Sequence, residues 1–421
     1  MATNRFSLVL LALTTTSLLG ACSADSALMS SDDDDSYAED VAGSSWDGDD
    51  DDDDGDVASD TADGEDESGS ISDDGNPGTG AGQLTAGEWR DLDNWDFWSA
   101  VLQRNDWAAM ESAWDFSTVN RFAVSVEDDG EPVADAVVVL QDAQGSITWE
   151  ARTDVHGEAE LFANLFDTSS IGPYTVTASD GLVSASVADL DPIWEDRVDL
   201  ELAGTAPNAV LDLMFVIDTT GSMGDELSYL QAELADVLST VQDGAGQSLE
   251  LRLSVNFYRD EGDQYVLRSF PFTTDLETSL SQLSAQDASG GGDWPEAVEQ
   301  ALDNAVYEHQ WSDSAVSRLM FLVLDAPPHN TAQNRDSIHA AVTDAAAQGI
   351  RIIPVAASGI DKSTEFLLRF MDISTGGTYT FLTDDSGIGN SHIEPTVGSY
   401  QVEFLNDLLT RLVLESIGQQ P

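Results

Sequence analysis

Between residues 119 and 204, apolar and β-branched residues occur in short runs that alternate with polar positions and end at turn residues. Turns are indicated by Asp128-Asp129-Gly130 and Ser179-Asp180-Gly181, where aspartate and glycine allow the chain to reverse. The predicted strands are Arg121–Val126, Ala136–Leu140, Ile147–Arg152, Ala159–Phe162, Tyr174–Ala178, Val183–Val187 and Val198–Leu202. Short strands at this spacing are typical of an all-β sandwich, which we expect over residues 119–204.

From residue 207 to residue 418 the apolar runs are separated by longer segments of helical periodicity. In Glu226–Val241, leucine and valine recur every three or four residues, which places them on one helix face. The predicted strands are Val210–Ile217, Leu249–Phe257, Leu319–Leu324, Ile350–Val355 and Tyr379–Leu382, and the other predicted helices are Pro295–Tyr307, Arg335–Gln348, Thr364–Met371 and Glu403–Ile417. This alternation favours a doubly wound, Rossmann-like α/β domain with a mostly parallel sheet covered on both faces.

Residues 85–118 carry five tryptophans among acidic positions. Trp95 and Trp98 are three residues apart, as are Trp107 and Met110, a spacing that puts each pair on one helix face. We therefore predict one or two short amphipathic helices that pack onto a neighbouring domain. A sugar-binding aromatic platform is the alternative function for these rings.

Residues 1–21 have the pattern of an export signal, with Arg5 before the short apolar stretch Ser7–Leu19. Leu19-Gly20-Ala21-Cys22 resembles the processing box of bacterial lipoproteins. That resemblance implies a lipid anchor on Cys22, whereas the alternative is a plain secretory signal. Ser23 follows the cysteine, which favours the outer membrane of the cell envelope, facing either the periplasm or the outside.

Residues 22–84 are of low complexity and contain the aspartate runs Asp32–Asp35 and Asp49–Asp54. Charge repulsion and scarce apolar residues predict a disordered, acidic tether. The whole chain has 79 acidic and 15 basic residues, a formal net charge of -64. Nucleic acids and anionic lipid surfaces require clustered lysine and arginine, so this composition argues against both partners. Contact with the membrane is expected through the lipid anchor alone.

Oxygen-bearing side chains follow two of the predicted apolar strands. Asp218, Thr220 and Ser222 stand at alternate positions of a tight loop directly after the strand Val210–Ile217. Asp325 ends another strand, and the two prolines that follow it prevent the strand or a helix from continuing. If these strands are neighbours, the two aspartates face one cavity at the carboxyl edge of the sheet. Carboxylate and hydroxyl oxygens on a fixed loop suit a hard cation such as Mg²⁺.

A third loop, Ser289-Gly290-Gly291-Gly292-Asp293-Trp294-Pro295-Glu296, precedes a predicted helix. Its glycines allow close approach of the backbone, and Pro295 and Glu296 suit the first turn of that helix. Asp293 then lies near the helix start, on a loop able to fold over the cation.

In this order, Asp-Thr-Thr-Gly-Ser-Met, Gly-Gly-Gly-Asp-Trp-Pro-Glu and Leu-Asp-Ala-Pro-Pro-His resemble the loops of the von Willebrand factor A fold with its metal-ion-dependent adhesion site. The resemblance covers residues 207–418, about half of the chain. It implies that Asp218, Thr220, Ser222 and Asp325 ligate one Mg²⁺, Mn²⁺ or Ca²⁺ ion. Asp293 stands where the family commonly has threonine, so the family pattern assigns its role less firmly. A carboxylate of a protein partner commonly completes the shell in this family, which implies an adhesion module and not an enzyme.

Counting charges adds to this resemblance. Three carboxylates around one dication leave a net negative site, which holds its metal well but attracts an acidic partner poorly. We therefore expect either Asp293 or Asp325 to coordinate through a water molecule.

Thr153–Ala159 resembles a turn of carboxypeptidase-regulatory-like domains, which implies that the predicted sandwich is a structural spacer.

The alternative function is that of a serine hydrolase. Thr220-Gly221-Ser222-Met223-Gly224 approaches the Gly-x-Ser-x-Gly pattern of a hydrolase nucleophile, with Ser222 as the nucleophile. Asp325 followed by His329, His339 or His392 would supply the remaining groups. This interpretation leaves Asp218 and the glycine-rich loop unexplained. A second, weaker cation site is suggested by Asp384, Asp385, His392 and Glu394, for which a polar loop is the favoured interpretation.

Overall fold

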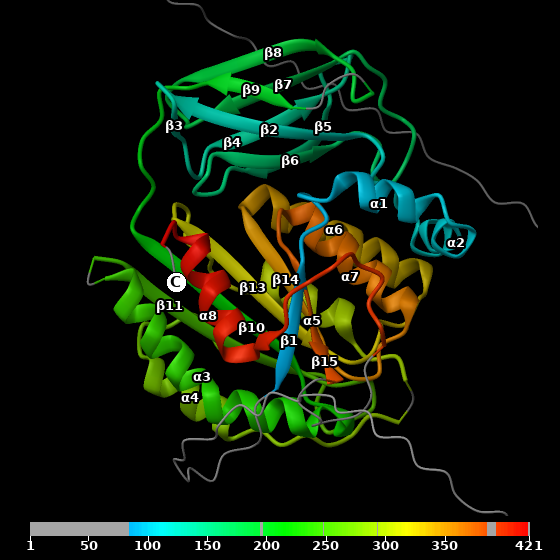
Figure 1. Ribbon diagram of the computed structural model, residues 1–421, viewed down its shortest axis with the longest axis vertical. Coiled ribbons are helices and arrows are strands. Elements are labelled where there is room, and N and C mark those ends of the chain that lie inside the picture. Colours follow the sequence, from blue (N-terminus) through cyan, green and yellow to red (C-terminus); the bar gives the residue numbers. More distant parts are fainter. Residues whose placement is uncertain (1–83, 194–196, 247, 293, 385–392, 420–421) are drawn as a thin grey trace, which may run out of the picture. The chain divides into compact units, whose positions relative to one another are not determined.

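The computed structural model describes residues 84–193, 197–246, 248–292, 294–384 and 393–419 (Figure 1). The predicted signal peptide, Cys22, the tether up to residue 83 and Asp293 lie outside these residues, and their roles stay predictions. Within the described ranges, no helix combines the length and the apolar character needed to cross a membrane.

An eight-stranded sheet forms the centre of the C-terminal region, in the order β12-β11-β10-β13-β14-β15-β1-β16. Its parallel strands are β11 (Glu250–Tyr258), β10 (Val210–Asp218), β13 (Ser317–Leu324), β14 (Ile350–Ala356) and β15 (Tyr379–Thr383). The strands β12 (Leu267–Arg268), β1 (Thr85–Trp89) and β16 (Glu403–Phe404) are joined to it antiparallel. The chain leaves β10 for β11 on one side and returns to β13 on the other. The carboxyl ends of β10 and β13 therefore form a topological switch point, where ligands bind in sheets of this kind.

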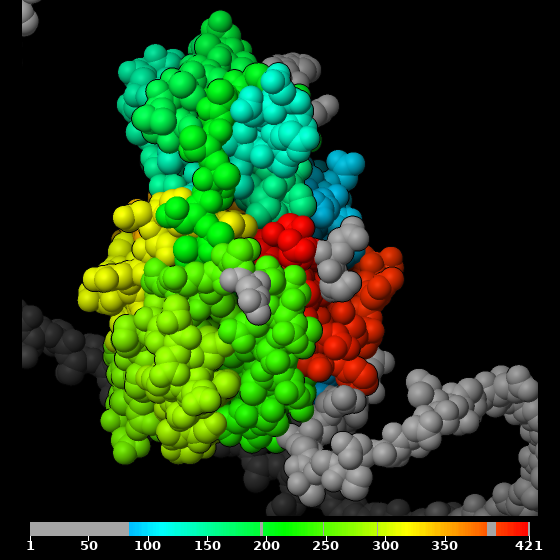
Figure 2. Space-filling model, turned by 90° about the vertical axis from the view of Figure 1, so that its left-hand side faces the viewer, coloured from blue at the N-terminus to red at the C-terminus, as the bar shows by residue number. Residues whose placement is uncertain are grey.

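Helices cover both faces of this sheet, as predicted (Figure 1). One face carries α3 (Gly224–Ala245), α4 (Leu276–Ser284) and α8 (Leu405–Ser416), and the other carries α5 (Val298–Tyr307), α6 (Ala332–Gln348) and α7 (Lys362–Thr375). Leu213 and Phe215 of β10 pack with the first group, whereas Met214 and Val216 pack with the second. Burial on both faces explains why β10 is apolar from Leu213 to Ile217. Figure 2 turns the surface formed by α3 and α4 toward the viewer, in green and yellow-green.

The segment predicted to be helical from residue 85 begins instead with the strand β1. Thr85 pairs with Thr383 and Trp89 with Tyr379, so β1 extends the central sheet beside β15. The prediction was wrong here because the pairing joins residues almost 300 positions apart, which a local pattern cannot reveal. The rest of the segment forms α1 (Trp95–Leu102) and α2 (Asn105–Trp114), two short helices.

Three tryptophans of α1 and α2 lie in the core of the protein. Trp98, Trp107 and Trp114 are at most 2% exposed. The Phe366 ring of α7 lies 5.7 Å from the Trp98 ring and 5.5 Å from the Trp107 ring. These indoles therefore attach α1 and α2 to α7, and their burial leaves them unable to serve as a sugar platform.

Residues 121–201 form two further four-stranded sheets at the positions predicted for the sandwich. One contains β2 (Arg121–Asp128), β3 (Glu131–Pro132), β6 (Glu158–Phe162) and β9 (Val198–Glu201), and the other contains β4 (Val137–Gln141), β5 (Ile147–Arg152), β7 (Tyr174–Ser179) and β8 (Ser184–Leu190). In the turn between β5 and β6, the Asp154 carboxylate accepts hydrogen bonds from the backbone N–H groups of His156 and Glu158. His156 is exposed, as expected of a turn residue.

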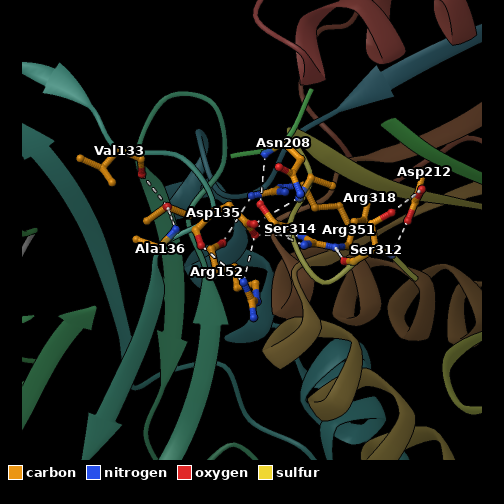
Figure 3. A network of polar contacts seen from close by, with 12 residues as sticks. Val133, Asp135, Ala136, Arg152, Asn208, Asp212, Ser312, Ser314, Arg318 and Arg351 are labelled. Atoms are coloured by element: carbon orange, nitrogen blue, oxygen red, sulfur yellow. Dashed lines mark hydrogen bonds and ion pairs between the residues drawn. The ribbon is translucent and has the colours of Figure 1, made fainter. Parts of the chain in front are cut away.

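Asp135 connects these smaller sheets to the central sheet (Figure 3). Its carboxylate accepts hydrogen bonds from both terminal nitrogens of Arg318 at 2.9 and 3.3 Å, and from Arg152 at 3.2 Å. The Arg318 and Asp135 side chains are only 4% and 7% exposed. This buried, bidentate ion pair holds the turn before β4 against the amino-terminal end of β13.

Candidate metal centre

Asp218 is the last residue of β10 and is fully buried. One carboxylate oxygen, Oδ1, accepts a hydrogen bond from the Thr220 N–H at 2.8 Å. The other oxygen, Oδ2, is buried and has no hydrogen-bond partner. Because Asp218 is 0% exposed, no bulk water solvates this oxygen. The geometry leaves one negatively polarised oxygen available to a cation.

Two hydroxyls stand beside it in the loop that follows. The Thr220 and Ser222 Oγ atoms lie 3.4 Å apart. A single 3₁₀ turn, Gly221–Met223, carries Ser222 and leads directly into α3. The loop is held in place by Thr219, whose hydroxyl donates to the Tyr258 carbonyl at 2.9 Å. The alternation read from the sequence thus brings both hydroxyls to one side of the turn.

Asp325 follows β13, the strand that pairs with β10. The register places Ile217 opposite Val323, so the two strands deliver Asp218 and Asp325 to the same edge. Asp325 is 5% exposed, and its Oδ1 atom is also buried without a partner. The condition set by the sequence, that these two strands be neighbours, is therefore met.

The glycine-rich third loop lies against the first. The Gly221 N–H donates to the Gly290 carbonyl at 3.2 Å, and the Ser289 N–H donates to the Thr219 carbonyl at 3.1 Å. Gly291 has a φ of 72°, and a Cβ atom there would lie 3.3 Å from the Thr220 Cβ. A side chain at this position would crowd the loop that carries the hydroxyls, so glycine is required. Asp293, the ligand predicted from this loop, lies outside the described residues.

Burial and mutual repulsion raise the pKa values of these acids. The pKa of Asp218 rises to about 7, first because the group is buried and next because Asp325 is negatively charged. Burial also raises the pKa of Asp325, although a hydrogen bond from Ser222 opposes this effect. The pKa of Glu296 rises to about 9 through burial and the charges of Asp218 and other nearby acids. A bound cation would favour the charged form of each group.

This set of groups fits a hard cation. Two buried carboxylate oxygens lack partners, and two hydroxyls stand in the adjoining loop. Within the described ranges, no three carboxylate, imidazole or thiol side chains are grouped closely enough to enclose a metal. The arrangement is therefore an open one, in which water or a ligand from outside would fill the remaining positions.

The structure brings together four of the five predicted ligands: Asp218, Thr220, Ser222 and Asp325. Their role as metal ligands stays a prediction. Sequence reasoning missed two buried groups at the same place, Glu296 and Tyr258. The Tyr258 hydroxyl and the Glu296 Oε2 atom are buried without partners. Asp218 and Tyr258 are paired in the sheet, which is the one signal that the strand pattern offered.

The histidines considered for a hydrolase have other contacts. His329 is 2.9 Å from an Asp260 oxygen, and His339 donates to the Trp114 carbonyl at 2.8 Å. His392 and Asp385 lie outside the described residues, as does most of the loop suggested as a second cation site. No observation in the described part of the chain places a histidine beside Ser222, whose hydroxyl hydrogen-bonds to Asp325.

Comparison with known proteins agrees with this architecture. Residues 212–376 match the von Willebrand factor A domain family, which supports a domain of this type in this part of the chain. A segment of 129 residues is 30% identical to a putative ariadne-like RING finger protein of Acanthamoeba polyphaga mimivirus. That match covers 31% of this chain and 12% of the viral protein, so it extends over only a small part of the relative.

Proposed function

We propose that this von Willebrand factor A domain binds one divalent cation and, through it, a protein partner. The cation would be held by Asp218, Thr220, Ser222 and Asp325, with Asp293 on the third loop. The observation that carries the proposal is the pair of buried, unpartnered oxygens on Asp218 and Asp325 at the switch point of the sheet. Buried carboxylates without partners lower the stability of a fold, so their presence there calls for a compensating charge.

Binding fits these residues better than catalysis does. The Ser222 hydroxyl lies beside Thr220 and hydrogen-bonds to Asp325, and neither residue can act as the strong base that a serine nucleophile requires. A cation at this position would instead supply an electrophilic centre whose open positions accept oxygen atoms of a partner. Among divalent ions, Mg²⁺ suits a small, rigid set of oxygen donors, and Mn²⁺ or Ca²⁺ are the alternatives.

The charge of the site restricts the partner. If Asp218, Asp293 and Asp325 all contacted the ion directly, the site would be negative and would attract a partner carboxylate only weakly. One of Asp293 and Asp325 is therefore expected to act through water. An acidic side chain of the partner can then complete the shell.

The rest of the chain would bring this domain to its partner. The sequence supports a lipid anchor at Cys22 and an extended acidic tether over residues 22–84. We infer a lipoprotein of the cell envelope, in the outer membrane, whose all-β region over residues 119–204 acts as a carboxypeptidase-regulatory-like spacer. Globomycin sensitivity of Cys22 processing tests the anchor, because lipoprotein signal cleavage requires prior lipidation of that cysteine.

A pull-down from envelope extract tests the function. The wild-type protein should retain a partner in Mg²⁺ and release it when a chelator is added. The Asp218→Asn variant should retain no partner under either condition. The control is Asp225→Asn, an exposed position in the first turn of α3, and this variant should behave as wild type. Partner retention that is indifferent to both chelator and Asp218→Asn would contradict a cation-mediated contact.

A further inference from the structure

Glu296 occupies a different place from the one its sequence context suggests. The helix predicted from Pro295 begins only at Val298, and Glu296 precedes it in an extended conformation. Its backbone forms a bridge with Pro328, and its N–H donates to the Pro327 carbonyl at 2.9 Å. Glu296 is thereby fixed to the loop that carries Asp325 and does not serve the helix amino terminus.

The side chain of Glu296 points toward the loop of hydroxyls. A Cβ atom built on Gly291 would lie 3.1 Å from the Glu296 Oε1 atom and 3.3 Å from the Thr220 Cβ. The Glu296 carboxylate and Thr220 therefore flank the same glycine. Glu296 is 3% exposed, and its Oε2 atom is buried without a hydrogen-bond partner. Nothing in the fold of the third loop accounts for a carboxylate buried in this way.

We propose that Glu296 is a further carboxylate, besides Asp293, through which the third loop reaches the cation, by accepting a hydrogen bond from a water molecule bound to the ion. This inference rests on the proposed function. An indirect contact is favoured because the described acids do not form a closed group of three around one point. Magnesium also keeps several of its waters when it binds to proteins, and those waters need acceptors.

Glu299 provides a matched control within the same helix region. It is 6% exposed, and its Oε2 atom is also buried without a partner. Its strongest charged neighbours, however, are His329 and Glu261, whereas those of Glu296 include Asp218 and Asp325. Replacing Glu299 by glutamine removes the same charge and the same kind of buried oxygen without altering the proposed water contact.

The test is calorimetric titration of Mg²⁺ and Mn²⁺ into wild type, Glu296→Gln and Glu299→Gln, with Asp218→Asn as the reference for ions bound elsewhere on this acidic chain. Loss of an outer contact typically weakens metal affinity by roughly tenfold to a hundredfold. We expect this weakening in Glu296→Gln and wild-type affinity in Glu299→Gln. Glu296→Asp keeps the charge on a shorter side chain and should show an intermediate loss of metal affinity. If the glutamine variant does not fold, the affinity of Glu296→Asp tests the role of Glu296 in its place.

Wild-type affinity in Glu296→Gln, or equal weakening in both glutamine variants, would overturn the role of Glu296 while leaving the cation site itself intact. Absence of any Asp218-dependent uptake by the wild type would instead overturn the proposed function, and the role of Glu296 with it.

Discussion

Asp218 ends a buried, mostly apolar strand, and its carboxylate has one buried oxygen without a hydrogen-bond partner, whereas Asp212 of the same strand is paired with Arg252 and Ser312. Asp325 is in the same situation on the neighbouring strand. Each residue alone would be an ordinary carboxylate at a strand end. Burial raises the pKa of both carboxyl groups, and the charge of Asp325 raises the pKa of Asp218 further, so the fold brings two like charges into one poorly solvated place. Two poorly solvated like charges lower the stability of the fold, and such a loss of stability is expected at a binding site and not at a purely structural position.

The sequence predicted these residues because local pattern controls their placement. Asp218, Thr220 and Ser222 alternate in a tight turn directly after an apolar run, and two prolines fix Asp325 at its strand end. Glu296 escaped prediction because proline and glutamate before an apolar helix are typical of a first turn. Its actual position depends on the bridge with Pro328, a contact between distant residues that no local pattern encodes.

At the residue scale, we predict that Asp293→Ala leaves the fold intact. A side chain that serves only as a ligand contributes to metal binding and not to the hydrophobic core. The free energy of unfolding without metal should change by no more than about 0.5 kcal/mol, as for ordinary surface substitutions. Urea denaturation in the presence of a chelator measures this change. Failure of the variant to fold would show that Asp293 has a structural role and is not purely a ligand.

At the scale of elements, the long apolar strands and amphipathic helices of the α/β domain were predictable, and the short or distant ones were not. β10, β11, β13, β14 and β15 were each predicted to within two residues at either end. The two-residue strands β12 and β16 are too short to show a period, and β1 becomes a strand only because β15 offers it an open edge. The helix α4 has only nine residues and was also missed.

A buried ion pair adds to the strand pairing and ring contacts that attach β1 and α1 to the domain. Asp91 follows β1, and its two oxygens accept hydrogen bonds from Arg369 of α7 at 2.6 and 2.7 Å. Both side chains are completely buried. Asp91→Asn would leave the Arg369 guanidinium with an incomplete set of partners, and breaking a buried pair typically costs about 3–5 kcal/mol.

We therefore expect Asp91→Asn to lower the free energy of unfolding by an amount on this scale, measured by urea denaturation. Asp93→Asn is the control, because the Asp93 side chain is 62% exposed and pairs with Arg90 at the surface. Equal stability of the two variants would contradict the role given to the Asp91–Arg369 pair.

His339 makes the contact between α6 and its neighbours dependent on pH. Its ring stacks on Phe166 at 4.2 Å and donates to the Trp114 carbonyl. Burial lowers the pKa of His339 below its usual value of 6.5. The folded protein therefore binds this proton less readily than the unfolded chain does, so folding stability is lost as the pH falls through about 6.5 and below.

His339→Gln keeps a donor for the Trp114 carbonyl but cannot take up a proton. Asp336, Asp115 and Arg335 are the charged groups around His339, and the substitution leaves all three in place. Between pH 7.5 and pH 5.5, wild type should lose more stability than the variant in thermal denaturation. If wild type and variant lose the same stability over that pH range, protonation of His339 is not the cause of the pH dependence.

At the scale of the whole molecule, the smaller sheets and the central sheet are joined by polar contacts as well as by a shared apolar core. Asp135 has a φ of 61°, and its carboxylate joins Arg318 and Arg152. The sequence predicted where the longer strands of both regions lie, apart from β1, but it did not predict this contact. Asp135 and Arg318 are separated by 183 residues, and the charges carry no periodic signal.

Asp135→Asn tests this contact without disturbing the backbone, because asparagine also tolerates the left-handed conformation. The variant should lose on the order of 3 kcal/mol, since Arg318 would keep a buried charge without its carboxylate partner. Differential scanning calorimetry should show the all-β region melting before the α/β domain. Asp129→Asn is the control, at an exposed turn position with a φ of 52°. A single transition unchanged from wild type would contradict the role of Asp135 in joining the two regions.

The most direct measurement of the central claim is a Mg²⁺ titration of the purified protein by calorimetry, compared with the Asp218→Asn and Asp325→Asn variants at several ionic strengths. The aspartate-rich N-terminal segment also attracts cations, so only the difference between wild type and these variants reports on the sheet edge. Our account predicts one site that salt screens weakly and that both substitutions abolish. Identical titrations for all three proteins, with Mg²⁺, Mn²⁺ and Ca²⁺ alike, would contradict it.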